Sequence, residues 1–320
     1  MPVGAQGKSV SIYQLTESTD GTKVTGNYRK LPVKSFSLSP TENLQQEVVL
    51  SSSSSGRDAS DPYRDFIDLT GDASVPLDVT NIGHWLRMLL GAPTTSGTTN
   101  YTHVFKSGSN AIPSASFEKV YGDINGANEG YTGVRASTWA LPIQPSGTAD
   151  CTFGLMGLSY TANLTSAPGT PTTATFERFQ RFQGSVARNG SALPAFMTGS
   201  LSFSNAMEAV KAIRNDRRIE GIDFGETSAQ FEGSVRLTAA NAAILTDAIA
   251  GTTCALTYSL DINANKSLFI ELPRVTLTPI GPRLEGPMGI DLPVRGIASF
   301  DATAVCTMRV TLKNQTASYT

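Results

Sequence analysis

Hydrophobic and polar residues alternate in short runs along most of the chain, a pattern typical of β-strands. Phe36 and Leu38 share one face of such a run while serines occupy the other, and Leu201 and Phe203 do the same later. Two stretches instead show helical spacing. Their apolar residues are Val79, Ile82, Trp85, Leu86, Leu89 and Leu90 in the first, and Ile244, Leu245, Ala248 and Ile249 in the second. The pattern predicts a mainly β protein with two short helices.

Five landmarks recur in the same order in the two halves, which indicates an internal duplication. They are turn dipeptides (Asp20-Gly21, Asn189-Gly190), Leu-Pro pairs (Leu31-Pro32, Leu193-Pro194), the two alternating strands, the blocks Ser74–Leu77 and Ser234–Leu237, and the segments Thr148–Thr152 and Thr303–Thr307. The fourth landmark is the strongest, because Gly91 and Gly251 keep the same separation in sequence as its two blocks, without a gap. We expect Asp20-Gly21 and Asn189-Gly190 to form tight hairpin turns.

The repeat also predicts local details. Asp78 and Thr238 are expected to cap the starts of the two helices, and Gly91 and Gly251 suit the positions after their ends. Cys151 and Cys306 are each expected inside a strand as buried packing thiols. In the second strand the apolar face would comprise Ala302, Ala304, Cys306, Met308, Val310 and Leu312.

These patterns predict two tandem copies of a β-sandwich or barrel domain, each with one flanking α-helix. The first domain would span residues 1–162 and the second 171–320, joined by a linker at 163–170. The polar stretch 40–62 is predicted to be a long loop, either functional or a mobile surface excursion. The second half has a shorter, more charged counterpart around Lys211, Arg214, Asp216, Arg217 and Arg218.

Composition narrows the classes of function. The length of 320 residues suits two domains, and a net charge of −2 with scattered Lys and Arg argues against a nucleic-acid reader. Three widely spaced cysteines favour neither a disulfide framework nor a zinc site. We expect no secretion signal and no membrane insertion, because the start lacks an apolar segment and no run approaches a membrane span.

No enzyme motif stands out. His84 and His103 lack metal-ligand or triad spacing, and Asp65, Asp68 and Asp72 lack the spacing of a calcium loop, so solvated acids on a strand are expected. A pair of carboxylates acting as in a glycosidase stays open. The sequence therefore assigns no catalytic residue, metal or cofactor.

Several segments resemble bacteriophage tail tube proteins, also called major tail proteins. Gly71–Asp78, Ile82–Leu86, Leu89–Gly91 and Pro93 look like the strand–helix block of that family. Tyr101–Phe105 and Pro113–Lys119 resemble the strands that follow it. The resemblance implies a β-sandwich or flattened barrel whose sheets join edge to edge around a ring, with a long loop that reaches the adjacent ring.

The resemblance also implies function: stacked rings enclose a channel through which DNA passes without sequence-specific binding. Because rings of this family have six domains, two domains per chain imply a trimer with pseudo-sixfold symmetry. The alternative is a hexamer whose second copy decorates the outside. Implied partners are further copies of the chain and other tail proteins such as the tape measure and tail terminator, in the virion tail and, during assembly, the host cytoplasm.

Two rival functions remain: a capsid-decorating or host-binding β-sandwich protein, and an enzyme acting on cell-wall polysaccharide. Within the tail tube hypothesis, Asp72 and Glu232 occupy equivalent positions and are candidates to face the lumen, the alternative being an outer sheet surface. The candidate ring-stacking loop contains Ser51, Ser52, Ser53, Ser54, Ser55, Arg57 and Asp58. We expect this loop to become ordered only when rings stack, so that deleting residues 45–60 leaves a folded subunit that makes no tubes.

Overall fold

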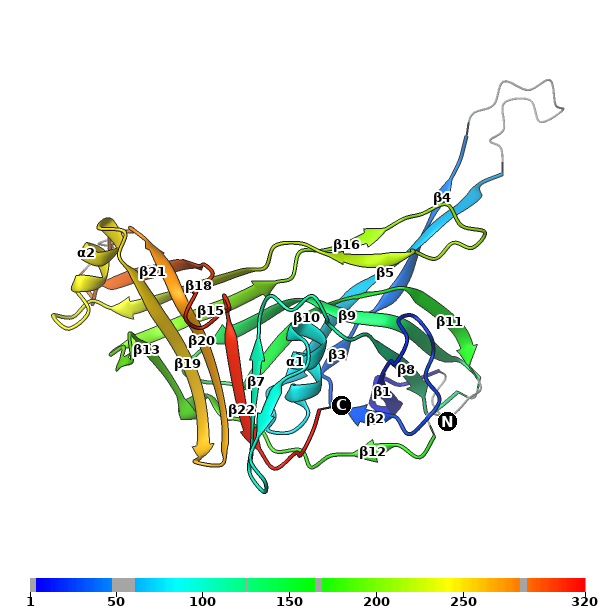
Figure 1. Ribbon diagram of the computed structural model, residues 1–320, viewed down its shortest axis with the longest axis horizontal. Coiled ribbons are helices and arrows are strands. Elements are labelled where there is room, and N and C mark those ends of the chain that lie inside the picture. Colours follow the sequence, from blue (N-terminus) through cyan, green and yellow to red (C-terminus); the bar gives the residue numbers. More distant parts are fainter. Residues whose placement is uncertain (1–3, 48–60, 125, 165–168, 283–286, 320) are drawn as a thin grey trace.

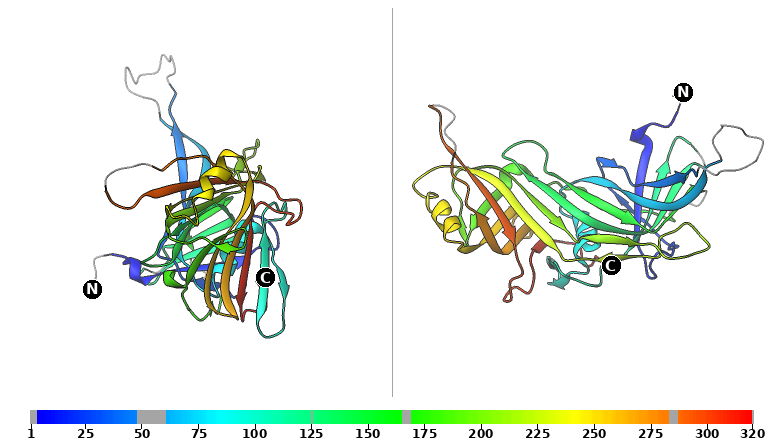
Figure 2. Two further views of the ribbon diagram at one scale, coloured as in Figure 1. Left: turned by 90° about the vertical axis from the view of Figure 1, so that its left-hand side faces the viewer. Right: turned by 90° about the horizontal axis from the view of Figure 1, so that it is seen from above.

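The alternating segments form strands, and strands make up most of the structure. The computed structural model describes residues 4–47, 61–124, 126–164, 169–282 and 287–319. The expectation of a mainly β protein with two short helices is confirmed for these residues. The molecule is elongated, with the second helix at one end and a projecting two-stranded arm at the other (Figures 1 and 2).

The first half contains η1 (Gly7–Ser9), β1 (Val10–Thr16), β2 (Arg29–Leu31), β3 (Ser35–Phe36), β4 (Ser39–Gln45), β5 (Tyr63–Pro76), α1 (Ile82–Leu90), β6 (Thr94–Ser96), β7 (Tyr101–Lys106), β8 (Ala115–Tyr121), β9 (Asn128–Ile143), β10 (Asp150–Gly157) and β11 (Ser159–Leu164). The second half contains β12 (Thr172–Thr173), η2 (Arg181–Gln183), β13 (Gly184–Arg188), β14 (Ser191–Ala192), β15 (Phe196–Ser204), β16 (Met207–Val210), β17 (Gly221–Phe224), β18 (Ser228–Arg236), α2 (Ala243–Ile249), β19 (Thr253–Asn263), β20 (Lys266–Thr278), β21 (Asp291–Ala298) and β22 (Arg309–Asn314).

One antiparallel sheet runs through both halves of the chain. Its strands follow in the order β4, β5, β10, β9, β15, β18, β21, β20. The seam between the halves is the β9–β15 pair, in which Leu141 lies opposite Leu201 and Ala140 opposite Ser202. The last strand, β22, also crosses between the halves, because it pairs with both β20 and β7.

The connection between the halves stays bonded to the first half. β12 pairs in parallel with β2, and the amide of Val79 donates to the carbonyl of Glu177. Buried hydrophobic residues from both halves form one continuous core. The domain boundaries placed at 162 and 171 stay predictions.

The core lies under one face of the long sheet, against α1 and the layer that contains β1 and β8. Trp85 of α1 stacks on Phe153 of β10 with ring centroids 5.5 Å apart, and Phe153 stacks on Trp139 of β9 at 6.0 Å. Cys151 is a free, buried thiol in β10, as predicted, and burial raises its pKa to about 12. Its role is therefore packing.

The helix start that Asp78 was predicted to cap is built as expected. The Asp78 carboxylate accepts hydrogen bonds from the amides of Asn81 and Ile82 at 2.9 and 3.0 Å. The prediction for Thr238 is wrong. There the side chain of Asn241 accepts from the Thr238 amide at 2.8 Å, and the Thr238 hydroxyl has no partner.

The two turn dipeptides differ from each other. Asn189 and Gly190 both have positive φ and connect β13 to β14 directly, which confirms the tight hairpin. Gly21 also has positive φ, but β1 and β2 are separated by residues 17–28. The prediction of a tight hairpin at Asp20-Gly21 is therefore wrong, because the chain makes a longer excursion there.

Cys306 is buried and free, but it does not lie in a strand. Strand β22 begins at Arg309, and Asp301–Cys306 form a turn closed by a bridge between these two residues. Ala302 is exposed and Ala304 is half-buried, and both lie in this turn, so the predicted apolar face is wrong for them and holds only from Cys306 to Leu312. Val305 has positive φ, which no strand pattern signals.

The stretch predicted as a loop from 40 to 62 begins as a strand. Pro40 to Gln45 belong to β4 and pair with the first part of β5, forming the arm that projects in Figure 1. The loop prediction is therefore wrong for this part. A two-stranded ribbon that is solvated on both faces can consist of polar residues, so its sequence shows no apolar alternation and looks like that of a loop.

Candidate assembly surfaces

The uncovered face of the long sheet is a broad surface of small and polar side chains. Strand alternation directs Leu201 and Phe203 into the core and Ser200 and Ser202 outward. The same alternation exposes Thr138, Ala140 and Pro142 in β9, Gln230 and Glu232 in β18, and Asp72 in β5. This surface is called the polar face below. Both acids singled out from the sequence therefore lie on it.

The two acids have different surroundings on the polar face. Glu232 lies opposite Arg295 in β21, and their side chains form an ion pair of 2.9 Å. Asp72 lies opposite Gly154 in β10. No cation of the described residues lies within ion-pair distance of Asp72. Of these two acids, therefore, Asp72 is the one whose charge is not compensated by a neighbouring cation.

Asp72 and Glu232 are also staggered across the sheet. The row directly across from Asp72 runs through Gly154, Thr138 and Ser204 to Ser228, four residues before Glu232. The two acids are thus four strand spacings apart, about 19 Å, and about 13 Å apart along the strands. An axis relating them is inclined to the strands by about 35°, the tilt that closed β-barrels require.

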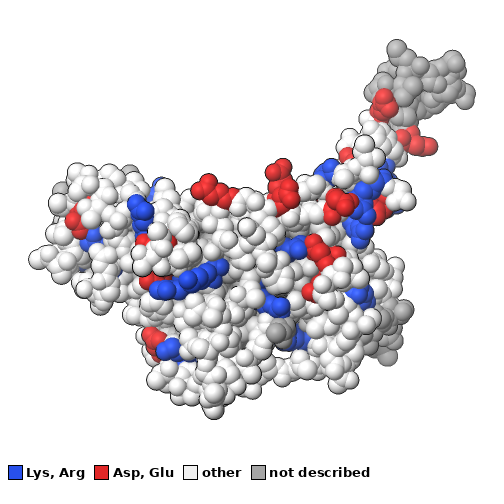
Figure 3. Space-filling model, in the orientation of Figure 1, with Lys and Arg blue, Asp and Glu red and all other residues white. Residues whose placement is uncertain are grey.

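A second surface forms where the arm meets the β16–β17 hairpin. The amide of Ile67 in β5 donates to the carbonyl of Arg217 at 2.9 Å, and Lys211 pairs with Asp68 at 3.0 Å. Arg217 also pairs with Glu42 of β4. Charged side chains gather at this base of the arm (Figure 3). The charged segment of the second half thus supports the arm of the first.

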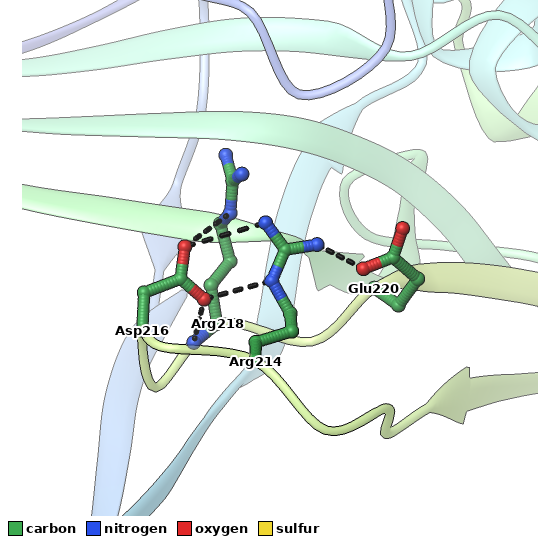
Figure 4. A network of polar contacts seen from close by, with 4 residues as sticks. All are labelled: Arg214, Asp216, Arg218 and Glu220. Atoms are coloured by element: carbon green, nitrogen blue, oxygen red, sulfur yellow. Dashed lines mark hydrogen bonds and ion pairs between the residues drawn. The ribbon is translucent and has the colours of Figure 1, made fainter.

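The hairpin loop holds its own ionic network (Figure 4). Arg214 lies between Asp216, at 2.8 Å, and Glu220, while Arg218 approaches Asp216 at 3.6 Å. The two arginines lower the pKa of Asp216 through hydrogen bonding and charge. Because these groups are exposed, the network shapes the loop more than it stabilises the fold.

The candidate stacking residues Ser51 to Ser55, Arg57 and Asp58 lie outside the described residues. The chain on either side of that segment is described up to Glu47, just after β4, and from Asp61, just before β5. Asp65 and Asp68, considered for calcium, lie on β5. In the described part of the chain no three His, Cys, Asp or Glu side chains are placed to hold a metal ion.

Both histidines have structural surroundings. His84 is buried against Tyr319 with ring centroids 4.8 Å apart, and burial together with Arg29 and Arg87 lowers its pKa well below the usual value. The ring of His103 contacts the hydroxyl of Thr95 at 2.8 Å and the carbonyl of Thr316 at 2.9 Å. No helix among the described residues has the length and apolar character needed to cross a membrane.

Sequence reasoning missed two features of these surfaces. It did not predict the β9–β15 seam, and it treated the arm and the charged hairpin as separate loops. A signal for the seam exists, because Ser37-Leu38-Ser39 recurs as Ser200-Leu201-Ser202. Only the second of these segments has a strand on each side.

Comparison with known proteins shows which family the chain belongs to. No curated protein matches the chain significantly. A family model described as phage tail tube protein matches residues 7–304, nearly the whole chain. The chain therefore belongs to the phage tail tube proteins, structural components of the virion tail.

Proposed function

We propose that three chains close into a ring and that rings stack into a tube through which DNA passes. The observation that carries this proposal is the staggered eight-stranded sheet. Its first four strands, β4, β5, β10 and β9, and its last four, β15, β18, β21 and β20, follow in the same order. The axis of the rotation that takes the first set onto the second is inclined to the strands by about 35°, as in a closed barrel.

Strand registers support the proposal that the halves are tandem copies. Val75 of β5 pairs with Cys151, and Val235 of β18, the counterpart of Val75 in the repeat, pairs with Leu292. The amide of Leu77 donates to the carbonyl of Ala149, and that of Leu237 donates to Ile290 in the same way. These registers match Cys151 with Leu292 and replace the sequence match between Cys151 and Cys306.

Repeating the step between Asp72 and Glu232 six times gives a wall about 45 Å across at the backbone, by strand spacing and rise alone. Such a channel is wider than a DNA duplex. The second half also lies in the same sheet as the first, which favours a trimer over a hexamer with second copies outside. Six equivalent units from three chains satisfy the closure that a rotational assembly requires.

The polar face suits the inner wall of this channel. Its side chains are mostly small and hydroxyl-bearing, so the surface has few cations that could bind phosphate groups. DNA would therefore slide along it without being held. Asp72 would repel phosphates within a Debye length of roughly 8 Å at physiological salt. In this arrangement both Asp72 and Glu232 face the lumen, but the repulsion comes from Asp72.

The arm is the element proposed to reach the adjacent ring. It projects from the body, and the hairpin loop supports its base through Lys211 and Arg217, whose carbonyl accepts from the Ile67 amide of β5. The segment 48–60, which lies between β4 and β5 in the sequence and outside the described residues, is proposed to make the contact with the next ring. Other tail proteins, such as the tape measure and tail terminator, are proposed partners, and the proposal assigns no catalytic role or cofactor.

Negative-stain microscopy of the concentrated protein tests the proposal. We expect hollow tubes, and native mass spectrometry of the smallest ring should give the mass of three chains. Rings of six chains would support the external second copy instead. A protein that stays monomeric at all concentrations would overturn the proposal in favour of a decorating or host-binding role.

A further inference from the structure

We propose that the seam between neighbouring chains copies the β9–β15 seam within the chain. In it, residues 37–39 on the free edge of one chain pair with residues 280–282 of the next. This inference rests on the proposed ring and names the two segments that close it. The occupant of each edge is a second copy of the same chain.

The first edge belongs to β3 and β4. Among the described residues these strands pair only with β5, whereas β15 pairs with β18 on one side and β9 on the other. Ser39 lies opposite Thr70, and Ser202 lies opposite Gln230, the counterpart of Thr70 in the repeat. Ser39 therefore occupies the position of Ser202, but its outer edge lacks the strand that Ser202 has.

The second edge follows β20. Thr278 lies opposite Arg295 of β21, as Thr138 lies opposite Gly154 of β10. Strand β19 covers the outer side of β20 only as far as Thr276. In the described residues beyond it, up to 282, that side has no strand partner. By the same count, Ile280 corresponds to Ala140 and Pro282 to Pro142.

These correspondences set the register of the proposed seam. Within the chain, Ala140 pairs with Ser202 and Pro142 with Ser200. Between chains, Ile280 would therefore lie opposite Ser39 of the neighbour. The row from Glu232 would then continue through Arg295 and Thr278 into the next chain with an unchanged stagger. The ring closes without a change in spacing only in this register.

The two seams differ at one pair. The amide of Asn205 donates to the carbonyl of Ser137, so hydrogen-bonded pairs alternate along the seam and include Phe203 with Trp139. The corresponding residues between chains are Pro40 and Pro279, which have no amide hydrogen. The proposed seam therefore ends at these prolines and is shorter than the seam within the chain.

Prolines on both free edges also hinder pairing with unrelated strands, a common protection of exposed sheet edges. Each free edge of a chain would thus pair only weakly, and the seams would be stable only when all of them form together in the ring. This arrangement favours closed rings over open chains of subunits.

Disulfide trapping tests the register. We expect assembled Ser39→Cys/Ile280→Cys protein to oxidise to covalent dimers and trimers, with trimers as the end point, on non-reducing gels. Opposed residues in a non-hydrogen-bonded antiparallel pair lie about 4.5 Å apart at Cα, close enough for a disulfide. The three natural cysteines are free and buried, so they contribute little background.

Two control variants and a second interchain pair complete the experiment. Ala140→Cys/Ser202→Cys places the same pair within one chain and should close without joining chains. Ser39→Cys/Asn265→Cys moves one thiol to the turn that precedes β20 and should run as a monomer on non-reducing gels. Ser37→Cys/Pro282→Cys provides a second interchain pair if the first variant fails to fold.

The outcomes separate the seam from the ring. If tubes form and the in-chain pair closes while neither interchain pair links subunits, the register is wrong and the tube proposal stands. Cross-linking of the mismatched pair as efficient as that of Ser39→Cys/Ile280→Cys also overturns the register. Absence of rings and tubes in the unmodified protein rejects both proposals.

Discussion

Tyr319 shows how one residue near the end of the chain organises two histidines that are distant in sequence. Its ring contacts His84 and His103 at centroid distances of 4.8 and 4.7 Å, and its hydroxyl donates to the carbonyl of Thr80 at 2.8 Å. Residues just before α1 are thereby fixed by a segment of the second half. Histidines that sequence reasoning considered for chemistry serve this packing.

The buried His84 makes stability depend on pH. Because its folded pKa is depressed, the unfolded chain binds a proton more readily once pH falls below about 6.5, and the stability that the neutral ring allows is lost. We expect the unassembled subunit to lose up to about 1.4 kcal/mol per pH unit below that value through this group. His84→Gln should remove this share of the dependence.

Chemical denaturation of both proteins at pH 7.5 and 5.5 measures this effect. Comparing the two proteins cancels the titration of the other groups, including His103, whose pKa burial also lowers. An identical change in unfolding free energy for both proteins would contradict the assignment.

The two helix starts provide a matched pair. Asp78→Ala leaves the buried amides of Asn81 and Ile82 without their acceptor and should cost about 1–3 kcal/mol of unfolding free energy. Thr238→Ala removes a hydroxyl without a partner and should change stability by less than about 0.5 kcal/mol. Equal losses in urea denaturation would show that the caps are equivalent after all.

At the scale of elements, periodicity located the helices and many of the alternating strands, because an element with one buried face has apolar residues at a regular spacing in the sequence. It failed where tertiary contacts decide. Nothing local shows that Asp20-Gly21 belongs to a long excursion, or that Asp301–Cys306 turns instead of extending. The choice between Thr238 and Asn241 as cap likewise depends on how the chain enters α2.

The arm carries an element-scale prediction. Replacing residues 48–60 with Asn-Gly keeps β4 and β5 paired, since a two-residue turn of this type matches their twist. We expect a subunit of unchanged thermal stability that forms rings but no stacked tubes in electron micrographs. Replacing Ala264-Asn265, the two residues between β19 and β20, with Asn-Gly is the control and should leave tubes intact. Tubes from the arm deletion would reject the stacking role.

At the scale of the molecule, the repeat was visible in sequence but its consequence was not. Landmarks that recur in the same order indicated two related halves, whereas the β9–β15 seam pairs residues whose partners no local pattern specifies. The same limit applied to the polar face. Strand alternation puts Asp72 and Glu232 on the strand face away from Val75 and Val235, but only folding brings Gly154 and Arg295 beside them.

Charge on the polar face yields a prediction for the assembled tube. Asp72→Lys should leave tubes intact in micrographs but lower the titre of phage that carry it, because a cation facing the lumen attracts DNA phosphates. Asp72→Asn has the same shape without the charge and should stay closer to the unmodified protein. Equal titres for all three would place Asp72 outside the channel.

The contrast between Gly154 and Arg295 has a consequence for symmetry. Three chains would present alternately anionic and charge-balanced positions around the bore, so the backbone would repeat six times per turn while the electrostatic potential repeats three times. A protein that docks end-on to this tube would meet two kinds of site in alternation. Its rotational setting would then have three equivalent choices, even if its own shape has sixfold symmetry.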